Sequence, residues 1–596
     1  MYRAFNLLTI HEKRKIVLVQ ILQIIFGILD LLGVAIVGIL GALAINGVKS
    51  NAPGNRVEFA LEFLKINKLA FQNQVAILGV IATLLFIFRT VLSVIFTKRI
   101  MFFLSRNSAT LTTNLVAKLL SSSLQSVQAR SSIQNLYALT EGVNCLMIGI
   151  LGNFLNIISD LSLLLVIGIG LFIVNPGIAL STFAIFGIIA LVLYSTMHIR
   201  AQNLGKENAF YSIQSNQKIL EVLNSYREAL VRDRTGYYIE EIRKLRLAGA
   251  ESSSELNFMP NISKYVIETA VILGSLLISA IQFLSQSAVH AVATLAIFMA
   301  AGSRIAPALL RVQQGSLNLK GNLGMSVSTL ELIDRLDHIT VEVKQVKKLD
   351  LVHLNFEPTL EVRGVNFKYN SNSQFAIENL NLTIPSGSII AIVGPSGSGK
   401  TTLVDLILGV LEPSSGDIKI SSKKPLEAIS TWPGAISYVP QEVMVSEATL
   451  KENISLGFAR EEVIDDQVLK AISLASLDDF SKGLRLGIET KLEERGNNLS
   501  GGQRQRIGIA RAFYTSPKFL VFDEATSALD EGTEQQISKT IESVKGEATI
   551  ILIAHRLSTV KIADHVVYLN SGKIECQGTY EYVRENVENF DIQSKL

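Results

Sequence analysis

Six long apolar stretches in the first half of the chain constrain its fold more than any other feature. The hydrocarbon core of a bilayer is about 30 Å thick, and an α-helix crosses it in about 20 residues. The stretches run at approximately 16–48, 75–97, 142–174, 177–198, 262–284 and 288–314. Because each is long enough to cross, they predict a six-helix, all-α transmembrane domain over residues 1–320.

The segments between these spans predict the orientation of the domain. Segments 98–141 and 199–261 carry many arginines and lysines, whereas the turns at 175–177 and 285–287 carry none. Cytoplasmic loops are enriched in basic residues. We therefore expect the two long loops, the N-terminus and the C-terminal domain on the cytoplasmic side of an inner (cytoplasmic) membrane.

Segment 49–74 is then expected on the outer face. Phe59, Phe63 and Ile66 recur there at helical spacing among charged residues. This pattern predicts a short interfacial helix. An ordinary amphipathic loop helix with no role in substrate handling is the alternative interpretation.

The chain changes character after the sixth span. Residues 321–356 are polar and charged and are expected to form a helical linker. From 357 to 596, short apolar runs alternate with turns and helical patterns, for example at 389–393, 519–522 and 549–553. Continuous runs rich in β-branched residues are typical of buried strands. The C-terminal part is therefore predicted to be an α/β domain.

Charge and cysteine content exclude several classes of protein. A formal net charge of +3 on 596 residues is too small to suggest a nucleic-acid partner. The two cysteines, Cys145 and Cys576, cannot build a secreted disulfide framework. We expect neither a nucleic-acid-binding protein nor a disulfide-rich one.

A glycine-rich motif follows the predicted strand at 389–393. It reads Gly394-Pro395-Ser396-Gly397-Ser398-Gly399-Lys400-Thr401 and fits G-x-x-x-x-G-K-[ST], with a helical run beginning at Thr402. Strand before and helix after are the context of a P-loop, whose backbone N–H groups surround phosphates. Lys400 is then placed to neutralise the β- and γ-phosphates, and the Thr401 hydroxyl to ligate Mg²⁺.

Two adjacent carboxylates end another predicted strand. Asp523 and Glu524 follow the apolar run at 519–522. A carboxylate at the C-terminal edge of a strand that faces a P-loop is the expected second Mg²⁺ contact. We expect Asp523 to hold the metal and Glu524 to polarise the attacking water.

Further motifs identify a family. The segment Leu499-Ser500-Gly501-Gly502-Gln503 resembles the signature of ATP-binding cassette transporters. Gln441 stands where the family has its Q-loop, Ser527-Ala528-Leu529-Asp530 resembles the D-loop, and His555 resembles the switch histidine. Tyr369 matches the aromatic residue that stacks on adenine. With the P-loop and the carboxylates, the resemblance covers nearly the whole chain.

The resemblance implies an ATP- and Mg²⁺-dependent hydrolase site. Its catalytic residues would be Glu524, His555, which contacts the γ-phosphate, and Gln441, which senses Mg²⁺; Mg²⁺ would be held by Thr401, Gln441 and Asp523. The residues expected to bind ATP are Tyr369, Gly394, Pro395, Ser396, Gly397, Ser398, Gly399, Lys400, Thr401, Thr402, Ser500, Gly501, Gly502 and Gln503.

The resemblance also implies a dimer. In this family the signature of one chain closes over the ATP that is held by the P-loop of another, and this chain has one copy of each motif. With every motif intact, a homodimer with two competent sites is favoured, and a heterodimer is the alternative. One departure is Glu493, which stands where many members have glycine.

Six spans fused ahead of the ATPase resemble an exporter half-transporter. Three arginines at membrane depth, Arg89, Arg304 and Arg311, are candidate substrate residues, because buried arginines tend to face cavities and pair with phosphate. Alternatively, Arg311 is solvated and Arg89 reaches the head groups, or Asp30 and Glu268 neutralise the arginines.

The predicted outer helix, the arginines and the run from Ala300 to Pro307 are similar to bacterial lipid-linked oligosaccharide flippases. This resemblance implies ATP-driven flipping of a polyprenyl-pyrophosphate glycan or a similar anionic lipid across the bilayer. A general lipid or multidrug exporter is the main alternative, followed by a peptide exporter. An ATP-gated channel or regulatory subunit is an alternative from another functional class. The intact Glu524 favours a transporter that hydrolyses ATP over this alternative.

Overall fold

The computed structural model describes most of the chain and divides it into two compact units. It describes residues 2–46, 71–174, 176–285, 288–341, 351–369, 374–493, 496, 498–526, 529–554, 556–588 and 590. One unit comprises Met1–Ser122 and Ser126–Val341, and the other comprises Ser123–Gln125 and Glu342–Leu596. The predicted outer helix at 59–66 lies outside the described residues.

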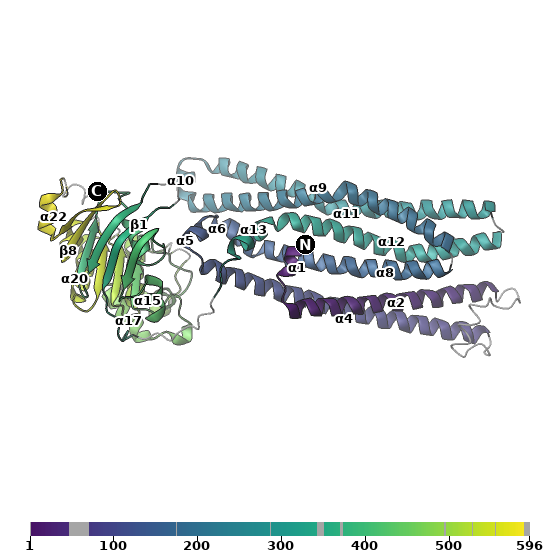
Figure 1. Cartoon of the computed structure of the whole chain (residues 1–596), viewed down its shortest axis with the longest axis horizontal. Coiled ribbons are helices and arrows are strands. Elements are labelled where there is room, and N and C mark those ends of the chain that lie inside the picture. Colours follow the sequence, from purple (N-terminus) through teal and green to yellow (C-terminus); the bar gives the residue numbers. More distant parts are fainter. Residues whose placement is uncertain are drawn as a thin grey trace. The chain divides into compact units, whose positions relative to one another are not determined.

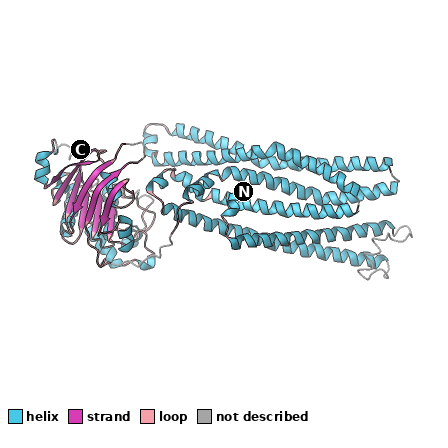
Figure 2. Cartoon of the chain, viewed as in Figure 1, coloured by secondary structure: helices cyan, strands magenta, loops and turns pink. Residues whose placement is uncertain are grey.

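The first unit is helical throughout its described part (Figure 2). Its long helices are α2 (Ile10–Asn46), α4 (Phe71–Leu120), α8 (Asn153–Val174), α9 (Pro176–Asn224), α11 (Thr235–Ser285) and α12 (Ala288–Met325). Its short elements are α1 (Tyr2–Asn6), α6 (Ser132–Leu139), α7 (Glu141–Asn144), the π-helix η1 (Cys145–Gly152), α10 (Tyr226–Val231) and α13 (Val327–Leu336). The residues of α5 (Leu124–Gln128) are divided between the two units.

The six predicted spans fall on these long helices. The third span begins in α7 and passes through the π-helix η1 into α8, so it is not a uniform α-helix. Within the described part of the chain, three segments are long and apolar enough to cross a membrane, namely Gln72–Leu120, Ser132–Ile173 and Ala179–Asn224. The helical transmembrane domain predicted from the sequence is confirmed.

The helices extend much further than the apolar spans. Helices α4, α9 and α11 contain 50, 49 and 51 residues, which makes each about 75 Å long at 1.5 Å per residue. This is more than twice the thickness of a hydrocarbon core. The expected cytoplasmic loops at 98–141 and 199–261 are therefore largely continuations of these helices, which is a correction to the sequence-based interpretation.

Glycines allow two of these helices to approach closely. Helix α12 contacts α8, α9 and α11, and α9 runs beside α11 (Figure 1). A Cβ atom at Gly205 of α9 would collide with the backbone oxygen of Gly321 in α12, and one at Gly324 would collide with the backbone oxygen of Gln202. The α9–α12 contact therefore depends on the absence of side chains at these positions.

The second unit contains two sheets. A three-stranded antiparallel sheet has the order β2 (Ile377–Ile384), β1 (Leu360–Phe367), β4 (Ser415–Ile420). A six-stranded sheet has the order β5 (Ile436–Val439), β6 (Phe519–Asp523), β7 (Thr549–Ile553), β3 (Ile389–Val393), β8 (His565–Asn570), β9 (Lys573–Gly578). The first five of these strands are parallel and β9 is antiparallel to β8.

Helices complete the second unit. They are α14 (Lys400–Ile407), α15 (Pro425–Thr431), α16 (Leu450–Ile454), η2 (Arg460–Glu462), α17 (Asp465–Leu474), α18 (Asp478–Gly483), η3 (Gly487–Glu489), α19 (Gly501–Phe513), α20 (Glu531–Ser543), α21 (Leu557–Val560) and α22 (Tyr580–Asn586). The three strands predicted from the sequence correspond to β3, β6 and β7.

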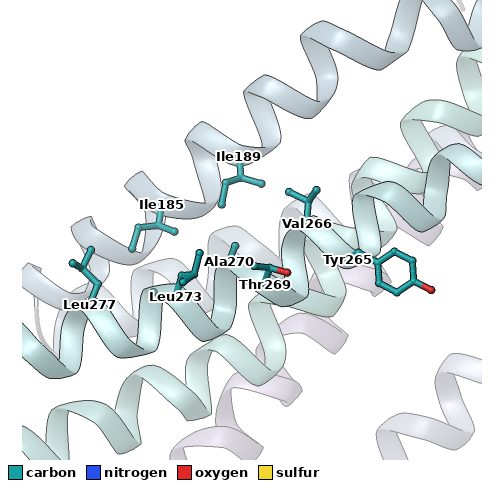
Figure 3. Close-up of a pocket in the computed structure, with 9 residues that line it drawn as sticks. Ile185, Ile189, Tyr265, Val266, Thr269, Ala270, Leu273 and Leu277 are labelled. Atoms are coloured by element: carbon teal, nitrogen blue, oxygen red, sulfur yellow. The ribbon is translucent and has the colours of Figure 1, made fainter.

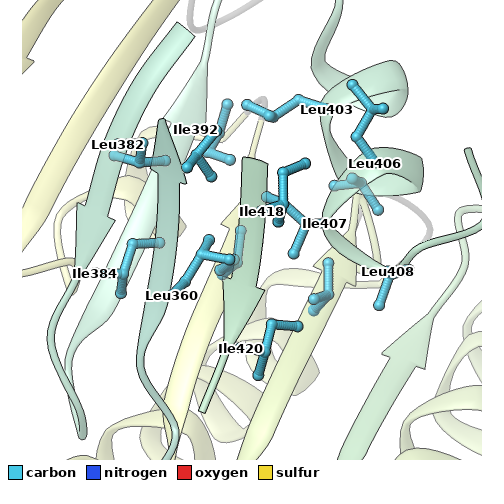
Figure 4. Close-up of a cluster of buried hydrophobic side chains, with 14 of the residues drawn as sticks. Leu360, Leu382, Ile384, Ile392, Leu403, Leu406, Ile407, Leu408, Ile418 and Ile420 are labelled. Atoms are coloured by element: carbon cyan, nitrogen blue, oxygen red, sulfur yellow. The ribbon is translucent and has the colours of Figure 1, made fainter. Parts of the chain in front are cut away.

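Helix α14 packs into the core that the two sheets share. Leu403, Leu406 and Ile407 of this helix are almost fully buried against Leu360 and Ile418 of the antiparallel sheet (Figure 4). The same core includes residues of β3, β6 and β7. Because α14 begins at Lys400, this packing fixes the start of the helix at the C-terminal end of β3, where the glycine-rich motif lies.

We predict that Gly205→Ala lowers the melting temperature of the membrane unit by several degrees. The added methyl group has to push α9 and α12 apart, and overpacking costs about 1–3 kcal/mol. The melting temperature can be followed with a thiol-reactive dye in a Cys576→Ser background, in which Cys145 of the membrane unit reports unfolding.

Gly187→Ala is the matched control, since it lies in the same helix and its added Cβ meets nothing within 4 Å. That substitution should leave the melting temperature unchanged or raise it, because alanine is the better helix former by about 1 kcal/mol. Equal shifts in the two variants would contradict the close-approach account.

Candidate functional site

The glycine-rich loop between β3 and α14 has a backbone that only glycine adopts readily. Gly394, Gly397 and Gly399 have φ values of 151°, 79° and 103°, in the region that disfavours side chains. A Cβ at Gly394 would also collide with the backbone oxygen of Leu569, and one at Gly399 would lie 2.8 Å from that of Ala376. These glycines are therefore required by the loop itself.

Lys400 is folded back onto this loop. Its Nζ donates to the backbone oxygens of Gly394 at 2.9 Å and of Pro395 at 3.1 Å. Burial lowers the pKa of Lys400, while the nearby carboxylates of Glu524 and Asp523 act in the opposite direction. The loop thus holds the Lys400 ammonium against its own backbone at the start of α14, and a cation beside a helix N-terminus is an anion-binding arrangement.

A cavity of about 530 Å³ opens beside the loop. This volume is within the range of small-molecule sites. Its lining residues are Tyr369, Gln374, Phe375, Ala376, Ser396, Gly397, Gly399, Lys400, Thr401, Thr402, Glu524, Ser571 and Gly572. Three residues of the predicted loop, Gly394, Pro395 and Ser398, do not line this cavity. They belong to the part of the loop that faces away from it.

Aromatic side chains mark one end of this cavity. The hydroxyl of Tyr369 lies 2.9 Å from Oγ1 of Thr402, and the Tyr369 ring packs edge to face on Phe367 with centroids 5.0 Å apart. Phe375 also lines the cavity, with the ammonium of Lys368 4.1 Å from its ring centroid. Phe375, Ser571 and Gly572 were not found from the sequence, because no motif contains them.

The two predicted carboxylates occupy different surroundings. Asp523, at the end of β6, is buried and accepts a hydrogen bond from Tyr438 at 3.2 Å. Burial, and then the charge of Asp523, raise the pKa of Asp405 in α14. Glu524 lines the cavity, and its Oε2 accepts a hydrogen bond from Nε2 of Gln441 at 2.7 Å. The structure therefore brings the P-loop, both carboxylates and Gln441 together.

The donor atoms suit a magnesium ion. The Thr401 hydroxyl and the Asp523 carboxylate are hard oxygen donors, and Mg²⁺ is usually held by one or two such protein ligands together with the phosphates of a substrate. Among the described residues, no group of three His, Cys, Asp or Glu side chains could form an all-protein metal cage. The described donor set thus fits a metal that arrives with a nucleotide.

The signature segment caps a helix. Ser500 is the N-cap of α19, where its Oγ accepts from the backbone N–H of Gln503 at 3.1 Å and the Gln503 side chain accepts from the Ser500 N–H at 2.8 Å. Ser500, Gly501, Gly502 and Gln503 are absent from the residues that line the cavity. Gln505 of the same helix donates to the backbone oxygen of Glu524 at 3.1 Å, which joins α19 to the chain segment that follows β6.

Several predicted residues cannot be placed. His555, Ser527 and Ala528 lie outside the described residues. Asp530, the last residue of the predicted D-loop, is the N-cap of α20 and accepts from the backbone N–H of Thr533 at 3.0 Å. Hydrogen bonding to Thr533 lowers the pKa of Asp530.

In the membrane unit, two of the predicted arginines lie near one carboxylate. Arg311 pairs with Asp160 of α8, with 2.7 Å between Nη2 and Oδ1 and 2.9 Å between Nε and Oδ1. Asp160 and Arg89 both line a small polar pocket of about 50 Å³, together with Gln23, Ser93, Thr97 and Ser159 and the less polar Gly27, Phe96 and Leu163.

Of the two carboxylates considered as alternative partners of the arginines, the structure places Glu268. Glu268 lies 4.0 Å from Lys264 in its own helix, and the described partner of Arg311 is Asp160. The side chains of Arg304 and Asp30 are outside the described part. Sequence reasoning missed Asp160, although a single carboxylate inside an apolar span was a usable signal.

A second, apolar cavity lies between α9 and α11 (Figure 3). It has a volume of about 530 Å³ and is lined by Ile185, Ile189, Tyr265, Val266, Thr269, Ala270, Leu273, Gly274 and Leu277. None of these lining residues carries a formal charge. Such a surface can accommodate hydrocarbon but offers little to fix a polar ligand.

Comparisons with known proteins agree with this geometry. Residues 377–527 match the family model described as ABC transporter. The chain is 29% identical to the ATP-dependent lipid A-core flippase of Ralstonia nicotianae over 80% of this chain and 81% of that protein. It is 34% identical to the flippase of the same name from Cupriavidus pinatubonensis over 46% of this chain and 50% of that protein.

Other comparisons differ in how much of the chain they cover. The chain is 37% identical to the ABC multidrug transporter MDR2 of Trichophyton rubrum over 43% of its length, which spans 19% of that protein. In structure it is similar to a bacterial Atm1-family ABC exporter with ATP bound, with a TM-score of 0.77, 23% identity and 97% of each chain covered. Residues 377–527 belong to the ABC transporter ATPase family, and the chain has the exporter half-transporter architecture, in which a helical transmembrane domain precedes the ATPase domain.

Proposed function

We propose that this transporter uses ATP hydrolysis to flip an anionic lipid, most specifically a lipid-linked oligosaccharide with a pyrophosphate linkage, across the inner membrane. The observation that carries the proposal is the cluster of Arg89, Arg311 and Asp160 within the apolar spans. Ionised groups are costly at that depth and are usually retained for function. The names of the bacterial relatives, which are ATP-dependent lipid A-core flippases, support a lipid substrate.

The ATPase residues have distinct tasks in this proposal. Tyr369 stacks on adenine, and Lys400 exchanges its backbone carbonyl partners for the β- and γ-phosphates. Glu524 accepts a proton from the attacking water, and its hydrogen bond from Gln441 orients it. When bound, Mg²⁺ neutralises charge on the phosphates; Thr401, Asp523 and Gln441 are the residues that would hold it. His555 is proposed to contact the γ-phosphate.

Two copies of the chain are proposed to complete each site. The signature residues Ser500–Gln503 do not line the cavity that the P-loop forms in the same chain. The start of α19, with the exposed Ser500 at its N-cap, is instead available to the nucleotide of a second copy. We propose a homodimer with both ATPase domains in the cytoplasm. The domain boundaries proposed for each chain are those expected from the sequence: 1–320 for the transmembrane domain, 321–356 for the linker and 357–596 for the ATPase domain.

A general lipid or multidrug exporter is the second candidate. The uncharged cavity between α9 and α11 favours it (Figure 3), as does the similarity to a multidrug transporter. The two candidates differ in their need for an anionic group on the substrate, which gives a direct test.

We predict that Glu524→Gln keeps ATP binding but reduces turnover by about 10²-fold or more, because general-base catalysis contributes about 10²–10⁴-fold. Turnover can be measured as phosphate release and binding with a fluorescent ATP analogue. Glu531→Gln is the matched control, since Glu531 is an exposed glutamate in the first turn of α20. Substantial hydrolysis by Glu524→Gln would remove Glu524 from the role of base.

Tyr369→Ala should raise the KM for ATP about tenfold, because the stacking of a base on an aromatic ring contributes about 1–3 kcal/mol. Tyr369→Phe keeps the ring and loses only the contact with Thr402, so its KM should stay close to that of the wild type. Tyr582→Ala, at another half-exposed tyrosine of the same unit, serves as control. If Tyr369→Phe and Tyr369→Ala were equally impaired, the hydroxyl rather than the ring would matter.

The proposal of an anionic substrate is tested by substrate-stimulated ATPase activity. Arg311→Gln should raise the polyprenyl pyrophosphate concentration for half-maximal stimulation about tenfold or more, since hydrogen bonds to charged groups contribute about 1.5–3 kcal/mol. Basal activity should persist. Arg200→Gln removes an exposed arginine that pairs with Glu255 and should leave the stimulation unchanged. Stimulation by amphipathic drugs but not by polyprenyl pyrophosphate would favour the multidrug exporter.

A further inference from the structure

One buried carboxylate of the ATPase unit has no task in the mechanism proposed above. Glu534 belongs to α20, and its side chain is only 6% exposed. An ionised carboxylate is costly to bury unless charged or hydrogen-bonding groups surround it. The helix that carries it is anchored, because Ile537 and Ile541 on the same face are fully buried in the core of the unit. Glu534 therefore has a fixed place beside this core.

The partners that the structure describes for the Glu534 carboxylate lie in the segment after the predicted switch histidine. Its Oε2 pairs with Nη1 of Arg556, and its Oε1 accepts hydrogen bonds from the hydroxyls of Ser558 and of Thr559, the latter at 3.2 Å. Arg556 follows His555 directly in the chain. Three side chains of this segment thus converge on one carboxylate.

The same arginine reaches the end of the predicted D-loop. Nη1 of Arg556 also donates to the backbone oxygen of Leu529 at 3.3 Å. Leu529 precedes Asp530, the N-cap of α20, and Glu534 lies one turn further along that helix. The pair of Arg556 and Glu534 therefore joins two loops, one after β6 and one after β7, and these strands are neighbours in the sheet.

We propose that Glu534 is a positioning residue for ATP hydrolysis, which holds the segment after His555 so that His555 can contact the γ-phosphate. This inference rests on the role proposed for His555 and deepens it. A donor stabilises the charge of a transition state most when the protein holds it in place beforehand. The bonds to Glu534 restrict a segment to which His555 is joined by a single peptide bond.

The proposed general base is held by other contacts. The backbone N–H of Glu524 donates to the oxygen of Ile553 in β7 at 3.1 Å, and its side chain accepts from Gln441 at 2.7 Å. Neither contact involves Glu534, which is also absent from the residues that line the cavity beside the P-loop. Loss of the Glu534 carboxylate should therefore act on His555 and leave both the base and the affinity for ATP unchanged.

The test uses the full-length transporter in lipid nanodiscs and measures ATPase activity over a range of ATP concentrations. Glu534→Gln keeps the size of the side chain and removes its charge. We expect kcat to fall about tenfold or more and the KM for ATP to stay within about twofold, because a contact made only in the transition state affects kcat alone. Glu542→Gln is the matched control, since it removes an exposed carboxylate from the same helix and should change neither.

A double-mutant cycle with His555→Ala shows whether the effect passes through His555. Residues that act as one unit have non-additive effects, so Glu534→Gln should lower kcat little further in the His555→Ala background. The second measurement is direct trapping of ADP with orthovanadate, which mimics the transferring phosphoryl group and needs no turnover. Glu534→Gln should bind ATP as the wild type does and trap ADP about tenfold less. Arg556→Gln should show the same pattern.

The outcomes separate this inference from the proposed function. If His555→Ala keeps the turnover of the wild type, His555 has no task at the γ-phosphate, and the inference is overturned together with that role. If His555→Ala loses turnover while Glu534→Gln keeps the kcat and the trapping of the wild type, the positioning role alone is overturned. An equal fold loss from Glu534→Gln in both backgrounds, or a parallel loss of kcat, ATP binding and melting temperature, would make Glu534 a purely structural residue and would overturn it as well.

Discussion

The absence of water from a bilayer is the constraint on which the membrane unit depends. Backbone N–H and C=O groups in hydrocarbon have to bond to one another, so the chain crosses as helices. The helices then continue well beyond the apolar spans, to 51 residues in α11. Where two helices touch inside a bilayer, van der Waals packing rather than the hydrophobic effect stabilises the contact. The glycines of α9 and α12 allow these two helices to approach closely enough for such packing.

The same constraint governs the charged residues. Arg311 is paired with Asp160, as the cost of isolated charge at this depth requires. A pair of this kind contributes little net stability compared with apolar packing, so its presence in a span suggests a role in ligand handling.

In the ATPase unit, the positions of the functional residues depend on the sheet edge at which the parallel strands end. Strands β3, β6 and β7 are neighbours within one parallel sheet, and their carboxyl ends meet at a common edge. The P-loop follows β3, and Asp523 ends β6. The site is therefore assembled by strand order, while the burial of α14 between the sheets holds Lys400 at that edge.

Much of this could be predicted from the sequence. The P-loop and Asp523–Glu524 were recognisable because each follows a short apolar run that is typical of a buried strand. The helical continuations of α4, α9 and α11 were not, because polar residues on exposed helices look like loop residues when apolarity is the signal. Phe375 was missed because it belongs to no motif. Asp160 was a usable signal, but its partner Arg311 is distant in sequence.

The most direct test of the central claim is translocation in proteoliposomes. A fluorescent polyprenyl-pyrophosphate oligosaccharide would be followed from one leaflet to the other, with and without ATP, for the wild type and for Glu524→Gln. The account predicts movement in one direction that requires ATP and is lost in the variant. Equal movement without ATP, or no movement while ATP hydrolysis continues and responds to neutral amphiphiles, would contradict it.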